Sequence, residues 1–132
     1  MTSRAEAAAP VQALRFVVVG AAAAATHWVC AVAAMHWLVP LVANVVGFAC
    51  AFPVSFAGHF HWSFRGRGAH WAHALPRFLA VALSSFAGNE LLYAALLRWL
   101  PWPPQASLVV TLLAVALSTF LLSRGWAFAR RH

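Results

Sequence analysis

Four long apolar stretches dominate the 132-residue chain, and short segments rich in arginine, proline or tryptophan separate them. They run over residues of about 14–38, 40–60, 78–100 and 106–128. Each has the length that an α-helix needs to cross a bilayer, about 20 residues. None alternates between apolar and polar residues as a barrel strand does. The pattern predicts an all-α integral membrane protein with four transmembrane helices, forming a single domain over residues 1–132.

Prolines divide these stretches at defined places. Pro40 suits the first turn of the second helix, where a missing N–H costs nothing. The segment Pro101–Pro104 (PWPP) predicts a tight turn between the third and fourth helices. Pro53 lies inside the second apolar stretch, so we expect a kink there. The first stretch is longer than the apolar part of a signal peptide, and we expect it to be retained as a helix.

The composition excludes a soluble domain. Hydrophobic residues make up 64% of the chain and charged residues 8%, whereas a soluble domain has about 25% charged residues. The net charge is +7, and every basic residue is an arginine. Because these arginines flank apolar runs and form no basic stripe along polar structure, we expect no nucleic-acid partner.

The distribution of arginines predicts the orientation in the membrane. Eight of the nine lie before the first helix, between the second and third, or at the end of the fourth, and only Arg98 lies in the other connections. Positive residues concentrate on the cytoplasmic side of membrane proteins. We therefore expect both termini and the central loop to be cytoplasmic.

The two halves of the chain resemble each other. The segment Arg15–Gly20 (RFVVVG) is echoed 62 residues later by Arg77–Ala82 (RFLAVA). The segment Ser55–Phe64 (SFAGHFHWSF) is echoed 64 residues later by Thr119–Phe128 (TFLLSRGWAF). The chain is therefore predicted to consist of two tandem helical hairpins in the same orientation, a parallel repeat.

These segments, together with ANVVGFACAFPVSFAGHFHWSF in the second stretch and RFLAVALSSFAGNELLY in the third, resemble the GtrA-like family of small four-helix membrane proteins. The resemblance implies translocation of a polyprenyl-phosphate-linked sugar across the inner (cytoplasmic) membrane. The translocated sugar would serve cell-envelope polysaccharide synthesis or O-antigen glycosylation, and the protein would act alongside a membrane glycosyltransferase. The alternative is a non-catalytic anchor or scaffold for a polyprenyl-phosphate glycosyltransferase. One departure is that many members carry Asn or Asp in the first helix, where this chain has AAAAATH, ending at His27.

Polar residues inside the apolar stretches are the candidates for a substrate path. Glu90 is the only acid within them, and an acid in a bilayer costs a few kcal/mol, roughly 3, so such residues usually face the bundle interior. His27 occupies the position in the first repeat that Asn89 occupies in the second, so we expect both at a similar depth in the membrane. This suggests a polar path of His27, Asn89 and Glu90. The alternative is that these groups only form interhelical hydrogen bonds. The full set of path candidates is His27, Asn44, Ser55, Ser85, Asn89 and Glu90.

Small residues recur on one face of the second helix, at Asn44, Gly47, Ala51, Ser55 and Gly58. Such a face is typical of close helix packing. It would also let a polar sugar pass with little steric obstruction, and the sequence does not separate these two interpretations.

Residues at the helix ends are candidates for holding a lipid phosphate. Arginine binds phosphate through two parallel N–H bonds and is attracted to anionic headgroups. The alternative is that these arginines only set the topology. Tryptophans at the same ends predict aromatic belts. The phosphate-binding candidates are His59, His61, Arg65, Arg67, Arg98 and Arg124.

Several classes of function are disfavoured. The histidines near residue 60 have no cysteine or acid nearby to complete a metal site, and no nucleophile–base pair is evident, so we expect no metal, no cofactor and no enzyme activity. A small ion or drug exporter fits the composition but not the family resemblance. Because four helices enclose little volume, we expect a homo-oligomer or a partner protein.

Overall fold

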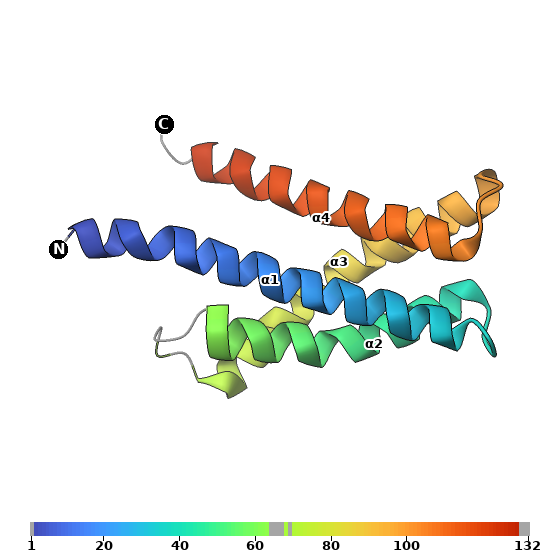
Figure 1. Ribbon diagram of the computed structural model, residues 1–132, viewed down its shortest axis with the longest axis horizontal. Helices are drawn as coiled ribbons and strands as arrows, with labels where there is room; N and C mark the ends of the chain where they lie inside the picture. Colours follow the sequence, from blue (N-terminus) through green and yellow to red (C-terminus); the bar gives the residue numbers. More distant parts are fainter. Residues whose placement is uncertain (1, 64–67, 69, 130–132) are drawn as a thin grey trace. The chain divides into compact units, whose positions relative to one another are not determined.

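A computed structural model of the chain describes residues 2–63, 68 and 70–129, and within these the side chains of residues 4, 8–63, 68 and 70–121. The described part consists of helices joined by short connections (Figure 1). These are α1 (Thr2–Ala34), α2 (Pro40–Gly58), the π-helix η1 (His59–Ser63), α3 (Trp71–Trp99) and α4 (Pro104–Ala129). No strand occurs among the described residues, so the predicted all-α class is confirmed.

Each of the four α-helices contains a segment long and apolar enough to cross a membrane. These segments are Ala8–Ala34, Pro40–Ser63, Trp71–Trp99 and Pro104–Leu121. Large apolar side chains point away from the protein along them; Val81 and Leu91, for example, are 70% and 74% exposed. In water this surface would be costly, whereas hydrocarbon accommodates it. The protein is therefore a multi-pass membrane protein, and the orientation of its termini stays a prediction.

Two helices begin earlier in the chain than the apolar stretches that predicted them. α1 begins at Thr2 rather than near residue 14, because its alanine-rich start favours the helical backbone. α3 begins at Trp71 rather than near residue 78. There the backbone N–H of Ala72 donates to the Nδ1 of His70 at 3.2 Å, which satisfies one of the N–H groups left open at a helix start.

The proline predictions are confirmed at both turns. Pro40 occupies the first turn of α2, directly after the extended Val39. Residues 100–103 form the turn between α3 and α4, and Pro104 is the first residue of α4. α2 continues through Pro53 to Gly58. The kink expected at Pro53 stays a prediction.

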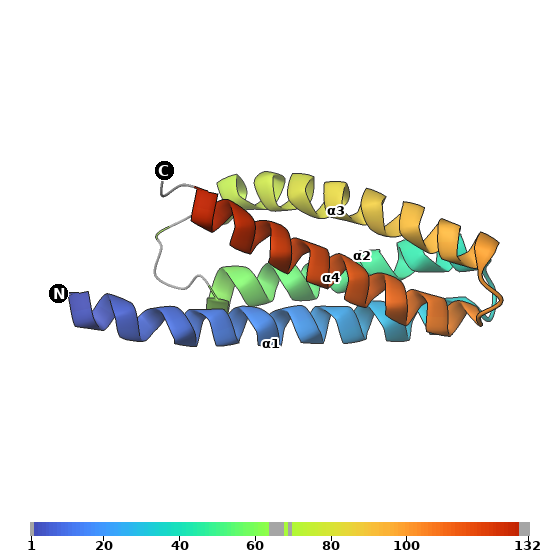
Figure 2. The same cartoon turned by 90° about the horizontal axis from the view of Figure 1, so that it is seen from above.

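α1 and α2 form an antiparallel hairpin that packs closely along its length (Figure 2). Glycines permit the approach. A Cβ atom on Gly47 would lie 2.6 Å from the carbonyl oxygen of His27 and 2.9 Å from the Cβ of Ala31. A Cβ atom on Gly58 would lie 2.6 Å from a methyl group of Val19. The backbones thus approach at distances that only a missing side chain allows, as small residues permit in membrane helix pairs.

The chain divides into two compact units, Met1–Leu83 and Ser84–His132, with the boundary inside α3. The first unit holds the α1–α2 hairpin, η1 and the first half of α3. The second holds the rest of α3 and α4. The expected single domain stays a prediction, and each unit is described separately below.

Burial recurs at the spacing of the sequence repeat. His27 and Ala31 are buried in α1, and 62 residues later Asn89 and Tyr93 are buried in α3. The same holds for α2 and α4 with an offset of 64 residues, as Ala43 and Gly47 are buried in α2 and Ser107 and Thr111 in α4. The tandem repeat itself stays a prediction.

Candidate functional site

A buried hydrogen bond joins the C-terminal part of α1 to the first turns of α2. The Nε2 of His27 donates to the Oδ1 of Asn44 over 2.6 Å. Asn44 has no exposed surface and His27 is 6% exposed. Gly47, one turn after Asn44, lies against the backbone and ring of His27. Two residues predicted as parts of a substrate path are therefore brought together, in the geometry of an interhelical hydrogen bond.

The small-residue face of α2 faces α1 along much of its length. Gly47 lies against α1 at His27 and Ala31, and Gly58 lies against Val19. Ala51 is buried, whereas Ser55 is only half-buried. Close packing is thus the role that the geometry gives to Gly47 and Gly58, and a role of this face in sugar passage stays a prediction.

At the other end of the same hairpin, α2 ends at Gly58 and continues directly as the π-helix η1. A π-helix is a rare turn that often occurs at functional sites. Within it, the Nδ1 of His59 hydrogen-bonds the Oγ of Ser63 at 3.2 Å, and both residues are buried. The ring of His59 stacks on Phe16 of α1, with the centroids 4.6 Å apart, and lies 6.0 Å from the ring of Phe78 of α3. His59 is thus enclosed by aromatic rings from two helices.

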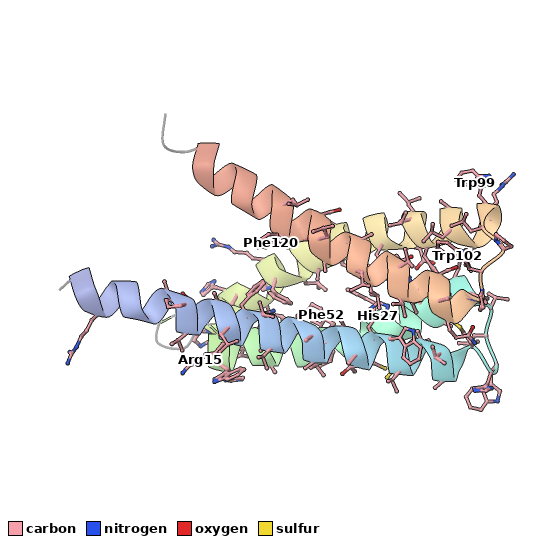
Figure 3. All side chains as sticks on the ribbon, turned by 45° about the horizontal axis from the view of Figure 1, so that its top comes forward. Arg15, His27, Phe52, Trp99, Trp102 and Phe120 are labelled. Atoms are coloured by element: carbon pink, nitrogen blue, oxygen red, sulfur yellow. The ribbon has the colours of Figure 1, made fainter. Side chains whose placement is uncertain are left out.

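Arg15 lies at this end of the hairpin (Figure 3). Its guanidinium carbon lies 5.6 Å from the centre of the Trp62 ring, in cation–π contact. Its Nη1 donates to the carbonyl oxygen of Trp62 at 3.5 Å. The half-buried Arg15 therefore ties α1 to the end of η1 and lies beside an exposed tryptophan of the expected aromatic belt.

A ladder of phenylalanines connects this end to α3. Phe52 and Phe56 of α2 lie 5.7 and 5.4 Å from Phe78, measured between ring centroids. Phe52 and Phe56 also stack on each other, with centroids 6.3 Å apart. These contacts place Phe78 against α2. They also place the backbone of Arg77, the residue before Phe78, near α2.

The second unit holds the remaining path candidates. Asn89 is buried, Glu90 is half-buried, and Ser85 is exposed. One turn after Asn89, the hydroxyl of the fully buried Tyr93 donates to the carbonyl oxygen of Pro104 at 3.1 Å, which joins α3 to the start of α4. The predicted path combines His27 of the first unit with Asn89 and Glu90 of the second, and it stays a prediction.

The phosphate-binding candidates differ in burial, and their role stays a prediction. His61 and Arg98 are exposed near helix ends, whereas His59 is buried. Arg65 and Arg67 lie outside the described residues, as does the side chain of Arg124. Trp37 is exposed in the turn after α1, Trp99 at the end of α3 and Trp102 in the turn after α3. Trp62 and Trp71 are exposed in η1 and at the start of α3. Among the described residues, no group of three or more His, Cys, Asp or Glu residues could hold a metal ion.

Sequence reasoning missed several residues that the structure brings to notice. Arg15 serves in the sequence analysis for topology, the repeat and the family resemblance, but it is not among the predicted site residues. Tyr93 is the only tyrosine, and nothing in its surroundings distinguishes it. Ser107 and Thr111 could have been found from the repeat, since they follow the small residues Ala43 and Gly47 by 64 positions. The Oγ of Ser107 is buried and has no hydrogen-bond partner among the described residues.

Comparison with known proteins identifies the family. A family model described as the GtrA/DPMS transmembrane domain matches residues 15–128, which include most of the first membrane-spanning segment and all of the other three. Searches among curated proteins and among solved structures gave no match. Domains of the matched kind are generally non-catalytic, and they point to the handling of polyprenyl-phosphate-linked sugars. The chain belongs to the GtrA/DPMS transmembrane-domain family.

Proposed function

We propose that the protein translocates a polyprenyl-phosphate-linked sugar across the inner (cytoplasmic) membrane, for cell-envelope polysaccharide synthesis or O-antigen glycosylation. The observation that carries this proposal is the family match over residues 15–128 of a chain with four membrane-spanning helices. The described residues of the matched region lie mainly in these helices, which supports a function within the membrane or at its surface.

The polar residues of α3 support this role. Asn89 and Glu90 lie near the middle of a membrane-spanning helix. A carboxyl group at that depth is costly, roughly 3 kcal/mol, and is usually kept for a function. During translocation, the isoprenoid chain would stay in the lipid while the sugar exchanges hydrogen bonds with such groups. The charge of the phosphate would be met by arginines at the helix ends.

A second candidate function is a non-catalytic anchor or scaffold for a polyprenyl-phosphate glycosyltransferase. The close packing of α1 on α2 favours it, because His27, Asn44 and Gly47 all serve the helix interface there. A scaffold needs a stable helical surface and no path for a sugar.

A partner chain is part of both proposals. Four helices leave little interior volume for a bulky lipid-linked sugar, so a homo-oligomer or a complex with a membrane glycosyltransferase would supply the missing surface. Native mass spectrometry of the protein released from detergent tests this point. A translocating preparation that contains only monomer would contradict it.

Reconstitution decides between the two functions. The purified chain is placed in vesicles whose outer leaflet carries a fluorescent polyprenyl-phosphate sugar, and its movement to the inner leaflet is followed by chemical quenching from outside. A translocase raises the rate above that of protein-free vesicles. A rate equal to that of protein-free vesicles, together with higher glycosyltransferase activity on co-reconstitution, would establish the scaffold instead.

A further inference from the structure

The phenylalanines of the two Arg-Phe pairs of the sequence repeat meet around one histidine. Phe16 of α1 stacks on the ring of His59 at 4.6 Å, and Phe78 of α3 lies 6.0 Å from the same ring. All of these residues belong to the unit Met1–Leu83. Since consecutive Cα atoms are about 3.8 Å apart, Arg15 and Arg77 begin from two helices that flank the same buried ring.

The position of Arg15 suits an anion receptor. Its guanidinium lies over the Trp62 ring. One N–H of the guanidinium donates to the carbonyl oxygen of Trp62 at 3.5 Å, a long hydrogen bond. A guanidinium has five N–H donors in a rigid fork. Among the described residues, its other donors have no hydrogen-bond partner at the end of η1, where Arg15 is half-buried and Trp62 is 41% exposed.

The charge balance of the chain requires external anions. Nine arginines face only two carboxyl side chains, Glu6 and Glu90. Most arginines therefore have no carboxylate partner within the protein. Arg15 and Arg77 lie near the starts of the membrane-spanning segments Ala8–Ala34 and Trp71–Trp99, where the available anions are lipid headgroups. Arginine binds phosphate with two parallel N–H bonds, which a sugar hydroxyl or a water molecule does not match in strength.

We propose that Arg15 and Arg77 bind the phosphate group of the polyprenyl carrier lipid beside η1, which α1 and the first half of α3 flank. The buried His59 sets the spacing of the two helices through Phe16 and Phe78, and Trp62 orients Arg15. This inference rests on the proposed function for the identity of the lipid. It places the phosphate at two arginines on the first helix of each repeat.

The test is a binding titration of the full chain in neutral-detergent micelles, with farnesyl phosphate as a short-chain probe. Farnesol, inorganic phosphate and a short-chain phosphatidylglycerol separate the contributions of tail, free phosphate and ordinary anionic lipid. The variants are Arg15→Gln, Arg77→Gln and the double variant. Arg4→Gln is the matched control, because Arg4 is an exposed arginine on the same helix as Arg15. Arg15→Lys keeps the charge and removes the fork.

We expect saturable binding of farnesyl phosphate, weaker by about tenfold for each single glutamine variant and unchanged for Arg4→Gln. Arg15→Lys should fall between wild type and Arg15→Gln. Circular dichroism and elution volume verify that the variants fold. Unchanged affinity in the folded double variant would overturn the proposal, and so would equal binding of inorganic phosphate or phosphatidylglycerol.

The binding result and the proposed function fail separately. If wild-type protein binds farnesyl phosphate through these arginines but does not move the lipid-linked sugar in vesicles, the binding site is supported and the proposed translocation is contradicted. If the double variant binds as well as wild type while the wild type translocates, the site falls and the proposed function stands.

Discussion

The two helical hairpins use their buried polar residues differently. In the α1–α2 hairpin, the polar pair is closed, since His27 donates to Asn44 across the helix interface and Gly47 brings the backbones together. In the unit of α3 and α4, the hydroxyl of Tyr93 donates to the carbonyl oxygen of Pro104 at the turn. Thr111 bonds to the carbonyl oxygen of Ser107 in its own helix, and the Ser107 hydroxyl is buried without a partner among the described residues.

This difference indicates a division of labour. Polar groups committed to each other across an interface stabilise one arrangement of helices. The second unit holds Glu90, the only acid in the predicted membrane spans, and the Ser107 hydroxyl, which is buried without a partner among the described residues, so we expect a functional role for its polar groups. Mutations that remove polarity should therefore lower stability in the first hairpin, and activity more than stability in the second unit.

The largest expected effect is at Gly47. Gly47→Val places a side chain against the carbonyl oxygen of His27, which is backbone and has little freedom to move. Overpacking of this kind costs about 3 kcal/mol. Unfolding by sodium dodecyl sulfate, followed by circular dichroism, measures the loss. Gly20→Val is the control, because a Cβ atom on Gly20 has nothing within 4 Å. Equal destabilisation by both variants would contradict the close packing of α1 on α2.

The hydrogen bond between His27 and Asn44 should have the next largest effect. Polar contacts between helices in a membrane contribute about 1 kcal/mol. A double-mutant cycle with His27→Ala and Asn44→Ala, measured in the same unfolding assay, should give a coupling of about that size. Strictly additive single effects would show that the two side chains do not interact in the membrane.

A smaller effect is expected at Tyr93. Tyr93→Phe keeps the buried ring and removes only the hydroxyl that donates to Pro104, so stability should fall by about 0.5 to 1 kcal/mol. Ser118→Ala serves as the control, since the exposed Ser118 hydroxyl bonds only to the carbonyl oxygen of Ala114 in its own helix. A Tyr93→Phe protein as stable as wild type would remove this contact between α3 and α4 from the account.

The smallest effect is expected at Ser107. Ser107→Ala removes a buried hydroxyl that has no partner among the described residues, so stability should change by less than about 0.5 kcal/mol or rise slightly. The unfolding assay measures this directly. A loss above about 1 kcal/mol would mean that the hydroxyl makes a hydrogen bond after all, and the contrast between the two units would weaken.

The sequence predicted the helices well and their ends less well. Apolar length decides what spans a bilayer, so four helices and the turns at Pro40 and at residues 100–103 followed from composition and proline chemistry. Helix ends depend on single hydrogen bonds. The start of α3 at Trp71 required the contact from Ala72 to His70, which no hydropathy pattern contains.

The site was predicted only in part, for a similar reason. Patterns identified which polar residues are unusual, including His27, Asn44 and Glu90, because charge and polarity are rare in lipid. They did not indicate that His27 and Asn44 are partners, since this depends on the register of α1 against α2 that Gly47 sets. The contact between Arg15 and Trp62 likewise requires the π-helix, which the sequence pattern did not predict.

The most direct test of the account is the rate at which reconstituted protein moves a polyprenyl-phosphate sugar, compared between wild type and Glu90→Gln at equal incorporation into vesicles. Glutamine has nearly the same size as glutamate, so the fold should persist and the unfolding assay should show little change. The account predicts a rate at least tenfold lower than wild type. A Glu90→Gln protein that translocates at the wild-type rate would contradict it and leave the polar residues of α3 with a structural role.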